Sequence, residues 1–150
     1  MKIRKLNTME EPPMSLLLLA DPSQDLISDY LKRGECFVAE NNHEKIGVFV
    51  LLPTRPNMVE LVNIAVAENY QGKGIGKQLV TDAMHRAKIK GYKTIEVGTA
   101  NSSINQLALY QKCGFRISGI DKDFFIRHYN EAIFENGIQA IDMIRLSRDL

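Results

Sequence analysis

The segment from Val62 to Lys77 constrains this chain more than any other part of its sequence. An apolar run, Val62–Val66, is followed by a short polar loop and then by the glycine-dense turn Gln71-Gly-Lys-Gly-Ile-Gly-Lys77. The residues that follow are amphipathic, so the segment predicts a strand, a turn and a helix. The three glycines leave backbone N–H groups unshielded, and the helix adds the positive end of its dipole. This arrangement predicts a site for phosphate groups, at which Lys73 and Lys77 would add positive charge.

Two familiar phosphate-binding motifs do not fit the spacing of this turn. A Walker A loop requires Gly-x-x-x-x-Gly-Lys-Ser/Thr, but Gln71 stands at its first glycine and Gln78 at its hydroxyl position. A dinucleotide fingerprint requires Gly-x-Gly-x-x-Gly in the first βα unit, but Lys77 stands at its third glycine and the turn lies in the middle of the chain. The pattern that fits is Gln-x-x-Gly-x-Gly, made by Gln71, Gly74 and Gly76.

A second motif, Leu-Tyr-x-x-x-Gly-Phe, runs from Leu109 through Tyr110 and Gly114 to Phe115. Gly114 suits the left-handed residue that ends a helix, and Lys112 would lie near the negative end of the helix dipole. The two motifs, in this order, resemble the pyrophosphate-binding and fourth-helix signatures of the GNAT superfamily of acyl-CoA-dependent N-acetyltransferases. The resemblance covers roughly residues 35 to 120 well and both ends of the chain poorly.

The remaining pattern predicts an α/β order in a single domain covering residues 1–150. Strands are expected over residues 2–7, 35–40, 45–52, 58–67, 94–99, 115–120 and 139–147, and helices over 16–20, 23–32, 75–90 and 104–112. Two of these strands, joined by the helix after the glycine turn, would form a right-handed βαβ crossover. The resemblance implies a GNAT-like fold, which is a mixed central β-sheet flanked by about four helices, with two parallel strands splayed apart around the thioester.

The resemblance also implies which residues contact acetyl-CoA. The expected contacts are Ile64, Ala65, Val66, Gln71, Gly72, Lys73, Gly74, Ile75, Gly76, Lys77, Asn101 and Tyr110. In the strand, the backbone groups of Ile64, Ala65 and Val66 would face the pantetheine arm. Ile64 and Val66 could also be ordinary strand core, and both interpretations can hold at once.

Asn101 matches a position at which the family often carries an asparagine that touches CoA. The gap from Asn101 to Tyr110 is nine residues, which is longer than is usual in the family. Ser102, Ser103 and Asn105 are therefore alternatives for this contact. All of them compete with a role as N-cap of the helix that follows.

Acetyl transfer to an amine requires few side chains, because a thioester is already activated. A general base must take the ammonium proton, and a donor must protonate the leaving thiolate. The resemblance makes Tyr110 the donor, with packing at a helix end as the alternative role. Glu60 matches the catalytic glutamate of histone-type members, and Glu96 matches the base proposed for ribosomal-protein N-terminal acetyltransferases. Either glutamate could instead point to solvent from a half-exposed strand. We rank Glu60 first.

Composition narrows the function further. Apolar residues make up 45% of the chain and charged residues 25%, which is ordinary for a soluble globular protein. The net charge of +1 gives no reason to expect nucleic acid or an anionic membrane as a partner. Cys36 and Cys113 form neither a disulfide framework nor a metal-type cluster, so no metal is expected. No signal peptide or membrane-spanning run is visible, which predicts a cytoplasmic protein.

The resemblance, with which composition agrees, implies an N-acetyltransferase that moves acetyl from acetyl-CoA to a primary amine by direct transfer in a ternary complex. The amine partner would be a small molecule or a peptide N-terminus, and by the resemblance its pocket lies near Phe124–Tyr129. The alternative is a non-catalytic acyl-CoA-binding regulatory protein of the same fold, against which the presence of Tyr110 and Glu60 argues. A nucleotide-binding module is disfavoured by the motif spacing. Oligomeric state is left open, with a homodimer as one option.

Overall fold

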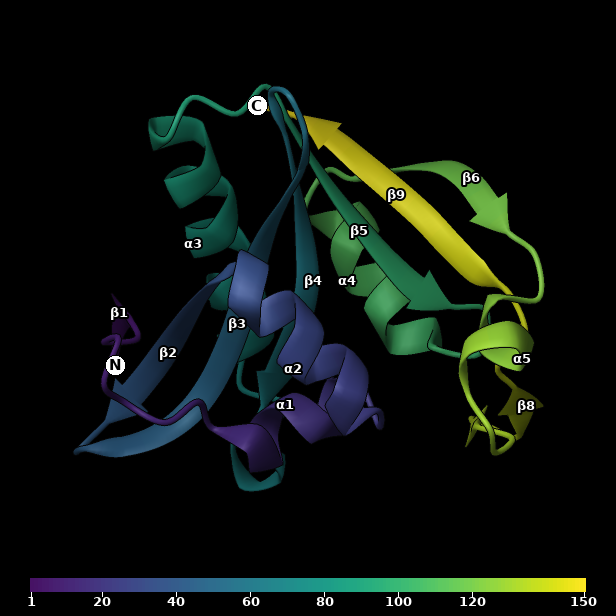
Figure 1. Ribbon diagram of the computed structural model, residues 1–150, viewed down its shortest axis with the longest axis horizontal. Coiled ribbons are helices and arrows are strands. Elements are labelled where there is room, and N and C mark those ends of the chain that lie inside the picture. Colours follow the sequence, from purple (N-terminus) through teal and green to yellow (C-terminus); the bar gives the residue numbers. More distant parts are fainter.

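A seven-stranded mixed β-sheet runs through the centre of the protein in the computed structural model, which describes residues 1–150. Its strands lie in the order β1-β2-β3-β4-β5-β9-β6, and a separate two-stranded hairpin, β7–β8, lies beside α5 (Figure 1). The strands are β1 (Lys2–Lys5), β2 (Glu35–Asn41), β3 (Glu44–Arg55), β4 (Met58–Val66), β5 (Thr94–Ala100), β6 (Arg116–Asp121), β7 (Phe134–Glu135), β8 (Ile138–Gln139) and β9 (Met143–Asp149). The helices are α1 (Met14–Ala20), α2 (Gln24–Arg33), α3 (Ile75–Ile89), α4 (Ile104–Lys112) and α5 (Phe124–His128), with a 3₁₀ turn at Glu68–Tyr70.

The two faces of the sheet carry separate apolar cores. On one face, α3 and α4 pack on the sheet, and side chains such as Leu79, Val80 and Phe49 are fully buried there. On the other face, α1 and α2 bury Leu17 and Ile27 against β2, β3 and β4. Helices therefore cover both faces, as the α/β pattern predicts.

β4 and β5 are the only parallel neighbours in the sheet, and α3 connects them in a βαβ unit. Their pairing is confined to Met58–Leu61 against Thr94–Val97, and beyond these residues the two strands separate (Figure 1). The register between β3 and β4 shifts at this point, because Leu51 opposes Leu61 while Val50 opposes Asn63. This bulge leaves one extra residue in β4 and increases its local twist, which turns the strand away from β5. The splayed strands implied by the family resemblance are thus present.

Helix ends follow the local chemistry of the sequence. The Ser23 hydroxyl accepts a hydrogen bond from the backbone N–H of Leu26 at 3.2 Å and caps the start of α2. Gly91 and Gly114 follow α3 and α4 with φ angles of 94° and 90°, in the left-handed region that favours glycine. The predicted terminators of these two helices are confirmed.

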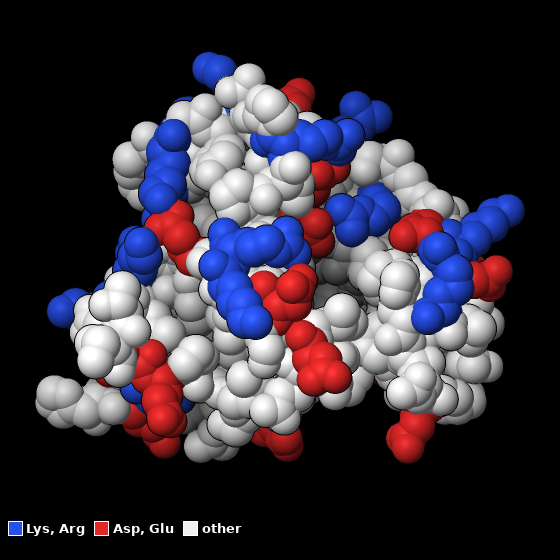
Figure 2. Space-filling model, in the orientation of Figure 1, with Lys and Arg blue, Asp and Glu red and all other residues white.

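The C-terminal third departs from the sequence prediction. α5 and the β7–β8 hairpin were not predicted, so the sheet is flanked by five helices rather than about four. The last strand of the sheet begins at Met143, because Gln139 belongs to the hairpin and the residues between them form a connection. Figure 2 shows, in the orientation of Figure 1, a hollow between the surface over α2 and the surface near α5.

Candidate active site

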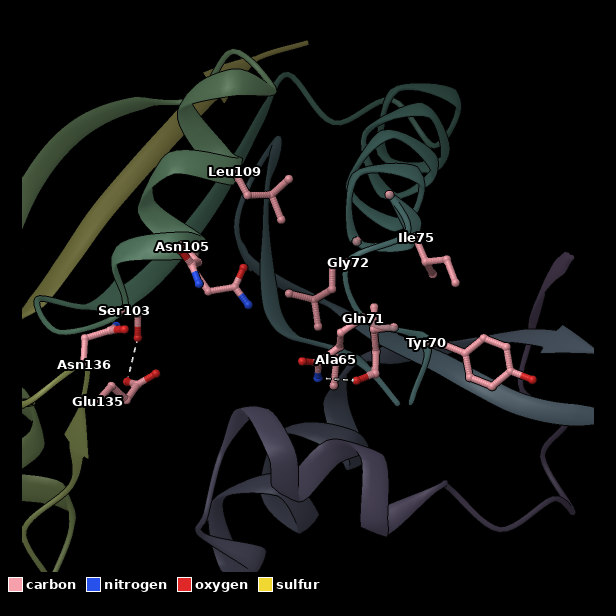
Figure 3. Close-up of a pocket in the computed structure, with 15 residues that line it drawn as sticks. Ala65, Tyr70, Gln71, Gly72, Ile75, Ser103, Asn105, Leu109, Glu135 and Asn136 are labelled. Carbon is pink, nitrogen blue, oxygen red and sulfur yellow. Dashed lines mark hydrogen bonds between the residues drawn. The ribbon is translucent and has the colours of Figure 1, made fainter. Parts of the chain in front are cut away.

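The glycine turn and the open part of β4 line one groove of about 450 Å³. The groove takes in most of the predicted cofactor-contacting residues: Ile64, Ala65, Val66, Gln71, Gly72, Gly74, Ile75 and Gly76. Its opposite wall comes from α4 and the β7–β8 hairpin, and Figure 3 shows Asn105, Leu109 and Glu135 across the groove from Ala65 and Gln71. Segments far apart in sequence therefore meet around the turn.

The turn presents backbone rather than side chains to the groove. Gly72 and Gly74 have φ angles of 77° and 80°, and nothing lies within 4 Å of the position that a Cβ would take at either residue. Gly74 is the N-cap of α3, so the N–H groups of residues 75–77 have no acceptor within the helix. Gln71 donates from Nε2 to the Val66 carbonyl at 2.9 Å, which ties the turn to the end of β4. These free N–H groups and the helix dipole fit a pyrophosphate.

The two lysines of the turn do not line this groove. Both are exposed, and the Lys73 ammonium lies 5.2 Å from the centre of the Tyr70 ring. Their contact with phosphate stays a prediction.

A second cavity, of about 590 Å³, lies where β4 and β5 separate, on the face covered by α1 and α2. Its walls are mostly apolar and include Leu18, Leu26 and Phe124. The groove and the cavity share four lining residues, which are Ile64, Ser103, Gln106 and Glu135. The two spaces therefore lie next to each other, and we call the place marked by these four residues the junction.

Tyr110 lines the second cavity from the last turn of α4. Its side chain is buried, its ring packs near Phe115 with ring centres 5.9 Å apart, and its hydroxyl makes no hydrogen bond within the chain. Burial raises the pKa of Tyr110, so the hydroxyl stays protonated at neutral pH. The Tyr110 hydroxyl is thus protonated and has no competing partner within the chain, and its role as proton donor stays a prediction.

The two candidate bases lie side by side, because Glu60 pairs with Glu96 in the register of β4 and β5. Glu60 lines the second cavity, whereas Glu96 lines neither space. Each carboxylate has an arginine neighbour: Arg145 lies 3.3 Å from Glu60, and Arg55 lies 3.7 Å from Glu96. The structure therefore brings one of the two glutamates to the site.

Asn101 lies outside the groove, contrary to the expectation from its position in the sequence. Its amide donates to the Gln139 carbonyl at 3.1 Å and accepts from the N–H groups of Ile141 and Asp142 at 2.8 and 3.1 Å. The side chain is occupied in holding the connection before β9. Ser103 and Asn105, two of the predicted alternatives, do line the groove.

The predicted capping of α4 is wrong. Ser103 stands at the N-cap position, but its side chain accepts no hydrogen bond from a helix N–H. The Ser103 hydroxyl instead donates to Glu135 Oε1 at 2.7 Å (Figure 3). The Ser102 hydroxyl donates to the same oxygen at 3.3 Å. The Ser103 hydroxyl is thus bound to the Glu135 carboxylate of the hairpin and does not cap the helix.

Two features of the site were missed from the sequence. Glu135 lies in β7, and the turn after it is Asn136-Gly137 with both φ angles positive, at 55° and 73°. Asn-Gly between short apolar segments is a hairpin signal and could have located β7 and β8. The other missed feature is a polar network beneath the cavity, which no local pattern indicates.

This network joins α1 and α2 to the sheet. The Asn63 amide nitrogen donates to the Leu17 carbonyl at 3.0 Å and to the Tyr30 hydroxyl at 2.8 Å. Both Tyr30 and Tyr129 donate to Asp21, at 3.2 and 2.8 Å. Burial, together with the Asp21 carboxylate, raises the pKa of each tyrosine, so both remain donors. Asn63 Oδ1 is buried without a hydrogen-bond partner.

Comparison with known proteins identifies the family to which the chain belongs. A family model described as "Acetyltransferase (GNAT) family" matches residues 3–115. The chain belongs to the GNAT acetyltransferase family. Among curated proteins, this GNAT chain is 65% identical over 135 residues to the uncharacterized N-acetyltransferase YvbK of Bacillus subtilis strain 168, covering 90% of this chain and 87% of that protein.

Solved GNAT structures share the whole fold. A GNAT family acetyltransferase from Elizabethkingia anophelis with acetyl-CoA bound superimposes with a TM-score of 0.98 at 50% identity, covering 99% of this chain and 97% of the other. A Bacillus subtilis acetyltransferase in complex with CoA superimposes with a TM-score of 0.94 at 60% identity, covering 99% and 98%. The predicted family and fold are confirmed.

Family membership makes acetyl-CoA the cosubstrate of this GNAT enzyme, and the groove fits it. The residues present meet its chemical needs, because free backbone N–H groups of the glycine turn are available for a pyrophosphate and the adjoining stretch of β4 has no strand partner on its β5 side. No group of three or more His, Cys, Asp or Glu side chains is placed to hold a metal ion. No helix is long and apolar enough to cross a membrane.

Proposed function

We propose that this enzyme transfers acetyl from acetyl-CoA directly to a primary amine, with both substrates bound at once. The observation that carries the proposal is the junction, where the groove adjoins the second cavity, which Tyr110 lines. An acyl donor in the groove and an amine in the cavity would meet there without leaving the protein. Such positioning supplies much of the rate enhancement when the acyl group is already activated.

Direct transfer is also supported by the lack of a cysteine nucleophile in either space. Neither cysteine lines the groove or the cavity. Burial raises the pKa of Cys36 to about 12 and raises the pKa of Cys113, so both thiols remain protonated and unreactive. An acetyl-enzyme intermediate on cysteine is therefore disfavoured.

In the proposed reaction, the free amine attacks the thioester carbonyl carbon while the carbon–sulfur bond breaks. Tyr110 donates its proton to the leaving sulfur, and the amine loses one proton to a base, so the products are an amide and a thiol. We assign the base to Glu60, because it lines the cavity that Glu96 does not reach. The non-catalytic alternative is disfavoured by the placement of Tyr110, whose hydroxyl lies in the cavity without a structural partner.

The proposal is tested by measuring thiol release from acetyl-CoA with a panel of amines: 2-phenylethylamine, spermidine and a short peptide with a free N-terminus. Product masses identify the acetylated amine. Initial rates measured against both substrates should give intersecting double-reciprocal lines. Parallel lines would contradict direct transfer, and calorimetric binding of acetyl-CoA without thiol release for any amine would favour the non-catalytic alternative. Cytoplasmic location and a homodimer stay predictions of the sequence.

A further inference from the structure

We propose that Glu135 binds the ammonium group of the acceptor at the junction, and that it makes the cavity specific for a primary ammonium carried on an apolar body. This inference rests on the proposed function and deepens it. It starts from the charges that line the second cavity, which are Asp21, Glu60, Glu135 and one cation, Arg145.

Three of these four groups already have partners within the protein. Arg145 donates to Glu60, so these two charges balance each other. Both oxygens of Asp21 accept hydrogen bonds, one from the Tyr30 hydroxyl and the other from the Tyr129 hydroxyl and the Ser23 N–H. No cation lies within ion-pair distance of Asp21 or Glu135. The cavity therefore carries more negative than positive charge. Of its carboxylates, Glu135 has an oxygen that is free to accept a hydrogen bond from a ligand.

The Glu135 carboxylate is held by one oxygen and free at the other. Oε1 accepts from Ser103 and Ser102, while Oε2 makes no hydrogen bond. The two serines are themselves fixed, because their side chains are 8% and 0% exposed and Asn136 donates to the Ser102 carbonyl at 2.8 Å. A carboxylate oriented in this way offers its second oxygen to a ligand at low entropic cost.

The position of Glu135 is the second argument. It is the only charged residue that lines both the cofactor groove and the cavity. The nitrogen that attacks a thioester must come to the place where these spaces meet, and an ammonium arriving there would lie within reach of Glu135. A charge-assisted hydrogen bond between ammonium and carboxylate is among the stronger polar contacts that a protein makes.

The rest of the acceptor follows from the walls of the cavity. Leu18, Leu19 and Leu26 line it from α1 and α2, and Phe124 and Phe125 line it from α5. These side chains offer no charge or hydrogen bond to a polar substrate body. The geometry therefore suits an arylalkyl or alkyl amine, rather than a polycation that would need several carboxylates.

Glu135→Gln is the decisive variant, because its amide oxygen can still accept from both serines while the negative charge is lost. Binding of 2-phenylethylamine to the enzyme saturated with CoA is measured by calorimetry, with 2-phenylethanol as the uncharged analogue. We expect the amine to bind the variant about 2- to 5-fold more weakly, because Glu135 is exposed in the free protein and solvent screens its charge. Affinity for 2-phenylethanol and for acetyl-CoA should be unchanged. In turnover, the loss should fall mainly on KM for the amine.

Glu131→Gln is the matched control, because Glu131 is an exposed carboxylate on the same segment without a hydrogen bond or ion pair, and it should bind the amine as the wild type does. Equal amine affinity in the wild type and Glu135→Gln would overturn the inference. So would an equal loss for amine and alcohol, which would mark a structural role. Failure of the wild type to bind 2-phenylethylamine would overturn the proposed acceptor class. If the amine binds through Glu135 but no amine of the panel releases thiol from acetyl-CoA, the proposed function fails, while the assignment of Glu135 as the ammonium-binding group stands.

Discussion

Replacing Asn63 with aspartate tests the hydrogen-bond network that holds α1 and α2 beneath the second cavity. The Asn63 amide is buried, and its nitrogen must face the Leu17 carbonyl, since a carbonyl can only accept. An ionised carboxylate at this position could donate neither to Leu17 nor to Tyr30, and it would bring an unpaired charge into the protein. The protonated acid could donate one hydrogen bond, so the folded variant is expected to take up a proton.

The cost of this substitution can be worked out from the proton uptake. An ordinary aspartate has a pKa of about 3.9, so keeping it protonated in the folded state costs about 4 kcal/mol at pH 7 and about 1.5 kcal/mol at pH 5. The sign follows because the folded-state pKa of the introduced carboxyl lies above its unfolded value. The penalty is therefore present above about pH 4, grows with pH at about 1.4 kcal/mol per unit, and disappears as the pH falls towards the unfolded pKa.

Asn63→Leu is the control, because it removes the same donor without adding a charge. Two lost hydrogen bonds are offset by apolar burial and by removal of the unpartnered Oδ1, so we expect a loss of about 1 to 2 kcal/mol that does not change with pH. Urea unfolding of each variant beside the wild type at pH 7 and pH 5 gives the differences. Equal destabilisation by the two variants at pH 7, or a gap between them that does not shrink at pH 5, would refute the reasoning.

Three further predictions concern the catalytic apparatus. Gly74→Trp should greatly weaken acetyl-CoA binding measured by calorimetry. The control Gly91→Trp should bind acetyl-CoA normally, because Gly91 also has a positive φ and open surroundings but lies at the far end of α3. Similar affinities of the two variants would show that the turn only connects strand and helix. Tyr110→Phe should lower kcat by about 10²- to 10⁴-fold with acetyl-CoA affinity retained, and a kcat within a few-fold of wild type would exclude the hydroxyl as donor. Glu60→Gln should depress turnover below the pKa of the amine and recover above it, while Glu96→Gln stays near wild type; normal turnover of both variants at low pH would mean that neither is the base.

The central part of the fold could be predicted because its signals are local. The glycines at the ends of α3 and α4 are needed wherever a helix ends in a left-handed residue, so their positions mark those ends. The strand–turn–helix order around Gly74 has a similar local cause. Apolar periodicity placed the strands and helices between residues 35 and 112 within a few positions of their observed bounds.

The C-terminal third was less predictable because distant contacts position it. α5 has five residues and β7 and β8 have two each, which is too short for a periodic pattern to show. Tyr129 is held by Asp21 across 108 residues, and Glu135 by Ser103 across 32. Asn101 had a motif position but is bonded to the connection before β9. None of these partners can be identified without the three-dimensional arrangement.

Because β4 and β5 pair over only a short stretch, the sheet consists of two parts, which we call leaves, that are joined at this stretch. One leaf is β1–β4 and the other is β5, β9 and β6, and four residue pairs join them. The second cavity has walls on both leaves, with Leu26 and Asn63 on one side and Ala100 and Phe124 on the other. We expect a cofactor seated between the leaves to influence their spacing and, through it, the width of the second cavity. On this reasoning we expect the affinities for acetyl-CoA and for the amine to be coupled, each substrate changing the binding of the other by the same factor.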